Sequence, residues 1–277
     1  MDINHQLLAF KEILENAIVS GGLKGKESAI RSSAPINLIH DAVKYELIKS
    51  GVCQGNVLPH LGTTKPEVKL AGFLKQKDQD VCVLPANIAE ERTEINWGPL
   101  AFERKVDPYG FDFSTNTLVI NVRSQMSSLA KNSDTLFERT FAEALNLHMR
   151  YPEMVLGEVY LIPTHEYDDN LAKENIVGFK SKSVNLEKYI SFFDSVNNRK
   201  ENDAPYRYER CALLIVDFNR EQPYLYNNSS ELIADGLLPK DFGIEYETLN
   251  FQTFASDILS IYASRYNLDN LKTDIKL

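Results

Sequence analysis

The chain is poor in the residues that build disulfide scaffolds, zinc sites and membrane spans. It has three cysteines and five histidines in 277 residues, and Cys53, Cys82 and Cys211 are scattered without CxxC spacing. This pattern argues against a disulfide framework and a zinc site and fits a reducing, cytoplasmic location. No apolar run approaches the roughly 18 residues that a membrane-spanning helix needs, so no membrane association is expected.

Several sequence motifs are also missing. The segment GLKGKES lacks the spacing of a P-loop, no HExxH pair is present, and no serine, histidine and aspartate array stands out. The opening segment MDINHQLLAFKEILENAI is acidic and amphipathic, unlike a signal peptide. The formal net charge of −9 fits a solvated acidic surface. It leaves room for a local basic groove, because net charge does not say where charges lie.

What is present is an ordinary globular composition, with 43% hydrophobic and 25% charged residues. Apolar periodicity predicts helices and strands along the whole chain. The predicted helices are 4–18 (ending at Gly21-Gly22), 34–48, one starting at a Thr135/Glu138 capping box, 186–196 and 251–266. The predicted strands are a hairpin with arms 68–74 and 80–84, a hairpin over 111–122, and buried strands at 154–163 and 211–218.

This succession of elements indicates an α/β fold with a central mixed β-sheet flanked by helices. We expect one domain over residues 1–277, with residues 1–33 as an N-terminal helical segment. Residues 85–110 have little periodicity, and they are expected to form a long loop or insertion.

The stretch LVINVRSQ (residues 118–125) holds polar residues on alternate positions. Asn121, Arg123 and Gln125 follow an apolar strand, and strand side chains repeat every two residues. All three are therefore expected on one face. A polar face at the end of such a strand must meet water, a ligand or a partner, or leave unsatisfied groups at about 1–3 kcal/mol each.

Several segments, in order over roughly residues 34–218, resemble Xho-type restriction endonucleases of the PD-(D/E)XK nuclease superfamily. AGFLKQKDQDVCV is similar to the family's Gly-aromatic, polar turn and Asp-apolar run, and VRSQMSSLAKNSDTLFERTFAEAL to its Lys-Ser-Gln loop and following helix. LGEVYLIP and YRYERCALLIV resemble a later strand and an Arg-Tyr-Glu segment. The resemblance implies a restriction-endonuclease-like fold.

The resemblance also implies site residues. Asp80 takes the place of the metal-binding Asp, Asn121 stands where the family usually has Glu, and Arg123 stands where it usually has Lys. Ser124 and Gln125 match the family directly. Asn offers a neutral oxygen to a hard cation, and Arg keeps the positive charge but cannot act as a general base.

A carboxylate that Asn121 does not supply is expected from elsewhere, with Glu67 and Glu143 as candidates. The resemblance implies a site-specific double-stranded DNA endonuclease that uses Mg²⁺ as part of a restriction-modification system. A homodimer follows from the palindromic symmetry of many restriction sites. Asp80, Asn121, Arg123 and Gln125 are the expected catalytic residues, and Asp80, Asn121 and Glu67 the expected metal ligands. The expected DNA-binding residues are Lys75, Lys77, Ser124, Arg92, Arg104 and Lys105, the last three in the insertion.

Two other functions are open. The Asn121 and Arg123 replacements favour a DNA-binding protein with a nuclease fold that no longer cleaves. Alternatively, the chain is an unrelated α/β protein, such as an interaction subunit, whose polar strand end is structural. In that case Asp80 caps its neighbours, Gln125 satisfies its own loop, and the turn lysines are solvated.

Overall fold

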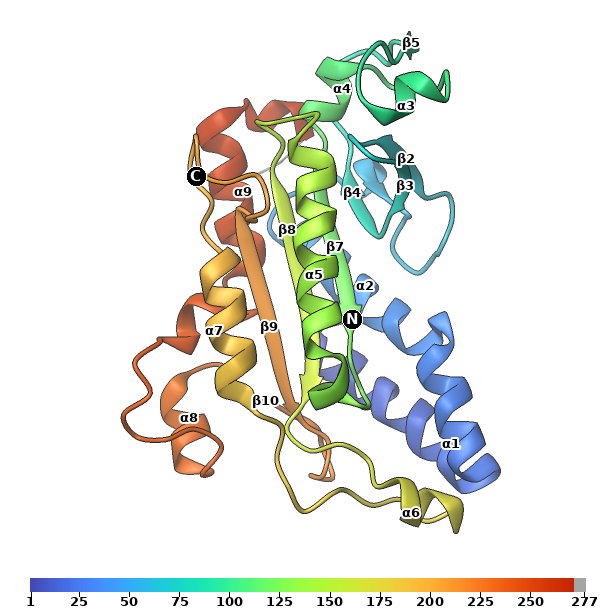
Figure 1. The fold of residues 1–277 in the computed structure, drawn as a ribbon, viewed down its shortest axis with the longest axis vertical. Coiled ribbons are helices and arrows are strands. Elements are labelled where there is room, and N and C mark those ends of the chain that lie inside the picture. The colour runs from blue at the N-terminus through green and yellow to red at the C-terminus, as the bar shows by residue number, and fades with distance from the viewer. Residues whose placement is uncertain (272–277) are drawn as a thin grey trace.

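The computed structural model describes residues 1–271 and places a six-stranded mixed sheet between two layers of helices (Figure 1). The strand order is β1-β4-β7-β8-β9-β10. β7, β8 and β9 run parallel, and the remaining neighbours pair antiparallel. Two further pairs, β2-β3 and β5-β6, stand outside this sheet. The α/β architecture with a central mixed sheet is therefore confirmed.

The strands are β1 (Val57–Leu58), β2 (Val68–Ala71), β3 (Gln76–Gln79), β4 (Val81–Val83), β5 (Thr93–Glu94), β6 (Val106–Asp107), β7 (Leu118–Ser124), β8 (Leu156–Pro163), β9 (Arg210–Asp217) and β10 (Tyr224–Leu225). The α-helices are α1 (Ile3–Arg31), α2 (Ser33–Lys49), α3 (Pro99–Phe102), α4 (Phe111–Thr115), α5 (Leu129–His148), α6 (Asp169–Lys173), α7 (Leu186–Val196), α8 (Ser229–Ala234) and α9 (Phe254–Arg265). Short 3-10 turns lie at Gln54–Asn56, Tyr246–Leu249 and Leu268–Leu271.

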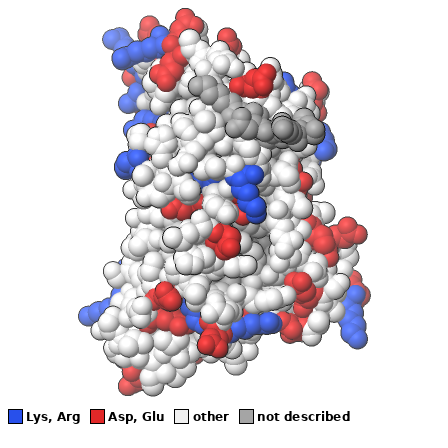
Figure 2. Space-filling model, turned by 180° about the vertical axis from the view of Figure 1, so that it is seen from behind, with Lys and Arg blue, Asp and Glu red and all other residues white. Residues whose placement is uncertain are grey.

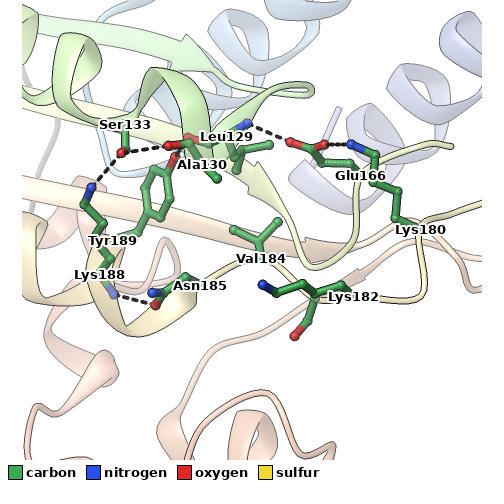
Figure 3. Close-up of a pocket in the computed structure, with 11 residues that line it drawn as sticks. Leu129, Ala130, Ser133, Glu166, Lys180, Lys182, Val184, Asn185, Lys188 and Tyr189 are labelled. Carbon is green, nitrogen blue, oxygen red and sulfur yellow. Dashed lines mark hydrogen bonds and ion pairs between the residues drawn. The ribbon is translucent and has the colours of Figure 1, made fainter. Parts of the chain in front are cut away.

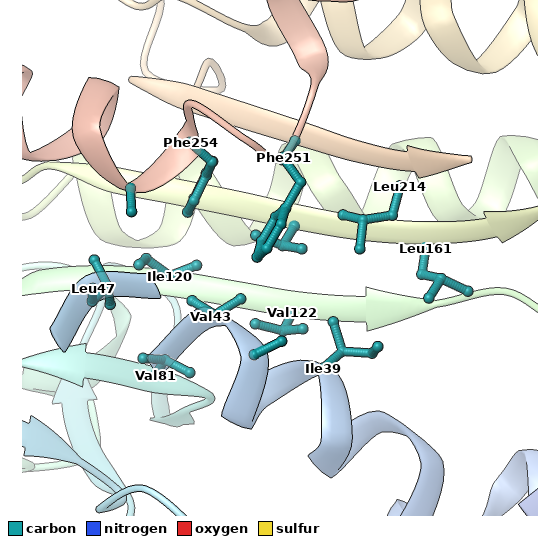
Figure 4. Packing of buried hydrophobic residues seen from close by; sticks show 14 of the residues in the cluster. Ile39, Val43, Leu47, Val81, Ile120, Val122, Leu161, Leu214, Phe251 and Phe254 are labelled. Atoms are coloured by element: carbon teal, nitrogen blue, oxygen red, sulfur yellow. The ribbon is translucent and has the colours of Figure 1, made fainter. Parts of the chain in front are cut away.

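One face of the sheet packs against α1, α2 and α9. Ile39, Val43 and Leu47 of α2 recur at helical spacing and meet alternate residues of the strands, such as Ile120 and Val122 of β7 (Figure 4). All five side chains are at most 4% exposed. Alternation along a strand therefore sends the odd-numbered residues of β7 to the opposite face.

That opposite face is covered by α5 and α7. Val119 of β7, Leu156 and Tyr160 of β8, and Tyr189 and Phe193 of α7 belong to this second apolar cluster. Asn121 and Arg123 share the strand face of Val119, so the polar end of β7 points into the layer beneath α5. This placement decides where the candidate site lies.

Five predicted elements are confirmed with small shifts of their ends: α2, α7, α9 and the two buried parallel strands β8 and β9. No helix in the described part of the chain combines the length and apolar character needed to cross a bilayer.

The predicted end of the first helix at Gly21-Gly22 coincides with a break at Gly22, which adopts the non-helical φ 58° and ψ −144°. A second helical stretch follows the kink and runs to Arg31, where no helix was predicted. The resumed turns are held in place because the Lys26 ammonium is buried and binds Asp169 and the carbonyl of Tyr167. The polar residues that follow Gly22 therefore form a packed helix.

The first predicted hairpin has the wrong second arm. β2 pairs with β3, with Val68 opposite Gln79, while β4 leaves this pair and joins β7, with Val81 opposite Ile120. The chain changes sheets at Asp80, whose side chain accepts a hydrogen bond from Val122 N–H at 2.9 Å. Asp80 therefore occupies the junction between the two sheets.

Two further predictions are wrong for local reasons. The hairpin over 111–122 is instead helix α4 followed by β7, and the turn between them is closed by Asn116 and Thr117 side chains bonded to the α4 backbone. Helix α5 begins at Leu129, not at Thr135, because the carboxylate of distant Glu166 accepts from Leu129 N–H at 2.7 Å. The 85–110 loop contains the short β5-β6 pair and α3.

The buried carboxylate of Glu209, just before β9, connects the start of β8 with residues of α5 and α9. Glu209 accepts hydrogen bonds from Leu156 N–H at 2.8 Å, Arg199 at 2.9 Å and Arg265 at 2.8 Å, and His148 lies 3.3 Å away. Burial alone would raise its pKa, but the hydrogen bond and charge of His148, the charge of Arg265 and the Leu156 N–H lower the pKa from its usual 4.5 to about 2.

A carboxylate whose pKa is lower in the folded than in the unfolded state stabilises the fold at pH values above its unfolded pKa. This stabilisation is lost as the pH falls toward the folded pKa. We expect Glu209→Gln to reduce the free energy of unfolding by about 3 kcal/mol at pH 7. The deficit should shrink between about pH 5 and pH 2, as measured by urea denaturation at several pH values. Glu153→Gln, an exposed carboxylate nearby, is the control and should have little effect. A pH-independent deficit for Glu209→Gln would contradict this assignment.

Candidate active-site cleft

A polar cleft of about 570 Å³ opens where the α1-α2 corner, the β2-β3 hairpin, the end of β7 and α5 meet. Asp80, Arg123 and Lys77 line it, together with the apolar side chains of Leu14 and Met126. Of the predicted site residues, the cleft lining contains Lys75, Lys77, Asp80, Arg123, Ser124, Gln125 and the candidate carboxylate Glu143.

Asn121 lies beneath the cleft and is 1% exposed. It is the strand neighbour of Glu158, since the two residues are paired in the parallel β7-β8 register. Leu156, Glu158 and Tyr160 are two residues apart along β8 and therefore share one strand face. Because Leu156 and Tyr160 belong to the α5-facing cluster, Glu158 points to the same side as Asn121. Glu158 is fully buried.

Arg123 is the cation nearest to this buried carboxylate among the described contacts. Its Nε lies 3.4 Å from Glu158 Oε1, and its guanidinium lies 3.9 Å from Glu143 Oε1. Burial raises the pKa of Glu158, the charge of Arg123 opposes this rise, and the charge of Asp80 adds to it. Asp80 and Glu158 therefore lie within electrostatic range of each other.

Glu143 of α5 is held differently. Lys77 Nζ lies 2.6 Å from Glu143 Oε2, and Lys75 Nζ lies 3.8 Å from Oε1. Although burial acts to raise its pKa, the hydrogen bond and charge of Lys77, with Arg123 and Lys75, lower it. Both lysines of the β2-β3 hairpin and Arg123 therefore surround the Glu143 carboxylate.

Several buried polar atoms in this cluster form no regular hydrogen bond within the described residues, although the Asn121 amide acts on Glu158 and lowers its pKa. They are both amide atoms of Asn121, both carboxylate oxygens of Glu158 and the hydroxyl of Tyr160. Each such atom costs free energy when it is left without water or a partner. Oxygens of this kind, next to Asp80, suit a hard divalent cation, which takes carboxylate and amide oxygens.

The histidine, cysteine, aspartate and glutamate side chains of residues 1–271 form no group of three or more that could hold a metal ion. Asp80 and Glu158 are two carboxylates, and Asn121 adds an amide oxygen. Mg²⁺ is commonly held by one or two carboxylates with water and substrate phosphate completing its shell. The donor set present fits this cation.

The remaining predicted residues lie elsewhere. Glu67 pairs with Lys65 and does not line the cleft. Arg92, Arg104 and Lys105 also lie outside its lining, in the insertion, where Lys105 is 3.6 Å from Glu103. Gln125 lines the cleft, but its amide donates to the carbonyl of Ser127, as expected of a loop residue.

Sequence reasoning missed three residues of this site. Glu158 carries a signal, because it is the one charged residue in the apolar run LGEVYLIP. His40 of α2 lies near Asp80, whose charge acts on its imidazole, and burial lowers the pKa of His40. Arg139 of α5 is exposed and lines the cleft, but no local pattern distinguishes it from other helix arginines.

A second pocket of about 400 Å³ lies at the starts of α5 and α7 (Figure 3). Lys180 and Lys188 line it, but Lys180 binds Glu166 and Lys188 binds Ser133 and Asp134. Glu166 also accepts from Leu129 N–H, so the helix start already has an anionic partner (Figure 3). Lys180 and Lys188 therefore have structural partners on neighbouring elements.

The α9 side of the molecule presents acidic and basic side chains interspersed around a broad uncharged area (Figure 2). Lys75, Lys77, Arg123 and Arg139 instead lie together at the cleft. Comparison with family models, with curated proteins and with solved structures gave no match to this chain.

The Arg123–Glu158 pair yields a stability prediction. Removing one partner of a buried ion pair costs about 3–5 kcal/mol, because the other charge stays buried without compensation. We expect Arg123→Met to lower the free energy of unfolding by about 3 kcal/mol, and Glu158→Gln by less, because Arg123 retains Glu143. The double variant should lose less than the sum of the two, measured by urea denaturation in a double-mutant cycle. Strict additivity would show that the two side chains do not interact.

Proposed function

We propose that the chain is a Mg²⁺-dependent double-stranded DNA endonuclease with a restriction-endonuclease-like fold, acting in the cytoplasm as part of a restriction-modification system. The observation that carries this proposal is the position of Asp80 and Asn121–Arg123. Asp80 directly precedes β4, which pairs antiparallel with the β7 strand of Asn121 and Arg123; Asp80 and Arg123 line a polar cleft, and Asn121 lies beneath it. This is the arrangement that the resemblance to Xho-type enzymes implies.

Each residue has a role in this proposal. Asp80 keeps one oxygen on Val122 N–H, so its carboxylate is oriented by the backbone of the neighbouring strand. The Asn121 amide oxygen and Asp80 would hold Mg²⁺, which when bound polarises the phosphate and activates a water molecule. Arg123 would offset the charge that develops on the phosphate. Burial acts to lower the pKa of Arg123, but Glu158 raises it above the usual value, so it stays charged.

The DNA backbone would be held by the cations at the cleft. Lys75 and Lys77 lie on the β2-β3 hairpin, and Arg139 faces them from α5. Lysine and arginine contacts to phosphate position a duplex without reading its sequence. Arg104 and Lys105, in the insertion that carries β5, α3 and β6, are proposed to contact bases or backbone farther along the duplex. A homodimer would match a palindromic site.

The second candidate is a DNA-binding protein with the same fold that does not cleave. It is favoured by the pairing of Arg123 with two carboxylates, which turns its charge away from an incoming phosphate. It is also favoured by the neutral side chain of Asn121 at a metal-binding position. Cleavage and binding assays separate the two functions.

We expect the purified chain to cut long unmethylated DNA into discrete fragments with Mg²⁺ and not with EDTA. Asp80→Asn should lower the cleavage rate about a thousandfold or more, because it removes a ligand charge at the metal. The matched control is Asp78→Asn, two residues away, whose exposed carboxylate lies 3.7 Å from Lys69. We expect this variant to cleave DNA at the rate of the original chain.

DNA that is retained in a gel-shift assay but left intact over a range of substrates and divalent metals would favour the non-cleaving candidate. The absence of both binding and cleavage would contradict the proposal. Equal cleavage by the Asp80→Asn variant would show that the activity lies outside this cleft.

A further inference from the structure

We propose that Glu158 is the missing carboxylate ligand: Asp80, Asn121 and Glu158 together form a divalent-cation site, and Arg123 neutralises Glu158 when no cation is bound. The metal-binding claim is independent of the proposed nuclease activity, although its use in cleavage rests on that function. Glu67 and Glu143, the carboxylates that sequence alone suggested, are not part of this site.

The sheet brings the three residues together. Asn121 on β7 is paired with Glu158 on β8, and Asp80 directly precedes Val81, which is paired with Ile120 on the other side of β7. Asn121 and Glu158 lie on the α5-facing side, because they share strand faces with Val119 and with Leu156 and Tyr160 of the α5-facing cluster. Asp80 lies at the junction just before β4 and lines the cleft. Asp80 also leans toward β7, since it accepts from Val122 N–H.

The unpartnered atoms point to a ligand that lies among these residues. Glu158 is 0% exposed and Asn121 is 1% exposed, and apart from an interaction of the Asn121 amide with Glu158, which lowers the pKa of Glu158, neither side chain forms a regular hydrogen bond within the described residues. Protein interiors rarely leave such atoms unsatisfied. A hard cation satisfies carboxylate and amide oxygens at once, and a purely structural salt bridge to Arg123 leaves the Asn121 amide oxygen without a partner.

The environment of Glu143 provides a contrast within the same cluster. Its two carboxylate oxygens form ion pairs with Lys77 and Lys75, so its negative charge is already compensated. Glu158 has Arg123 at 3.4 Å and no lysine contact. A cation entering at Asp80 and Asn121 would replace Arg123 at Glu158, and the released guanidinium would stay near Glu143 and the cleft.

The test is titration of the full chain with Mn²⁺ alone, followed by isothermal calorimetry without DNA. Glu158→Gln should weaken Mn²⁺ binding by about tenfold or more, and Asp80→Asn by at least as much, because each removes a ligand charge. Arg123→Gln should tighten Mn²⁺ binding by roughly tenfold, because it removes a competing positive charge. Circular dichroism and thermal melting verify that each variant is folded.

Glu143→Gln is the matched control, because it removes the same charge from the same cluster without removing a proposed ligand. We expect it to change Mn²⁺ affinity by no more than about twofold. Equal weakening by Glu158→Gln and Glu143→Gln would show a general field effect and overturn the proposal. Unchanged binding in folded Glu158→Gln, or no Mn²⁺ binding by the original chain, would also overturn it.

The two proposals can fail separately. Mn²⁺ binding that depends on Glu158 in a chain that never cuts DNA would support the cation site and contradict the nuclease. Mg²⁺-dependent cleavage with Mn²⁺ affinity insensitive to Glu158 would support the nuclease and overturn the role of Glu158.

Discussion

A buried carboxylate in the middle of a β-sheet needs a positive charge, and the candidate site is built around this requirement. Glu158 is flanked by the apolar residues of β8 and fully buried, so its charged form depends on nearby cations, above all the one on the neighbouring strand. Arg123 supplies that charge from β7. Because the two strands are parallel and in fixed register, the pair also sets which face of β7 carries Asn121. The same register directs the polar end of β7 under α5.

The cleft follows from how the chain enters and leaves this sheet. Asp80 marks the change from the β2-β3 pair to β4, and its carboxylate replaces a strand partner for Val122 N–H. The β2-β3 hairpin then projects Lys75 and Lys77 toward Glu143 on α5. Opposite charges thus meet at the mouth of the cleft, where a phosphate anion would compete with Glu143 for the lysines. A chain with a net charge of −9 can in this way present cations at one place.

Much of the architecture is predictable from sequence, because apolar periodicity reports burial. The helix α2 and the strands β8 and β9 follow from local patterns. The start of α5 does not, because its N-terminal partner is Glu166, far along the chain. Likewise, the pairing of β4 depends on β7, and Lys75–Gln79 carries no signal that it forms a strand of its own. Asp80 and Arg123 were found through resemblance, whereas Glu158 was hidden in an apolar strand whose register only the fold reveals.

The central claim is that Asp80, Asn121 and Glu158 hold a divalent cation at the base of this cleft. Crystals of the chain grown with Mn²⁺ and measured at the manganese absorption edge test it most directly. The account predicts one anomalous peak bonded to oxygens of all three side chains, with Arg123 displaced from Glu158. No peak at this position, with Arg123 still paired to Glu158 at saturating Mn²⁺, would contradict it.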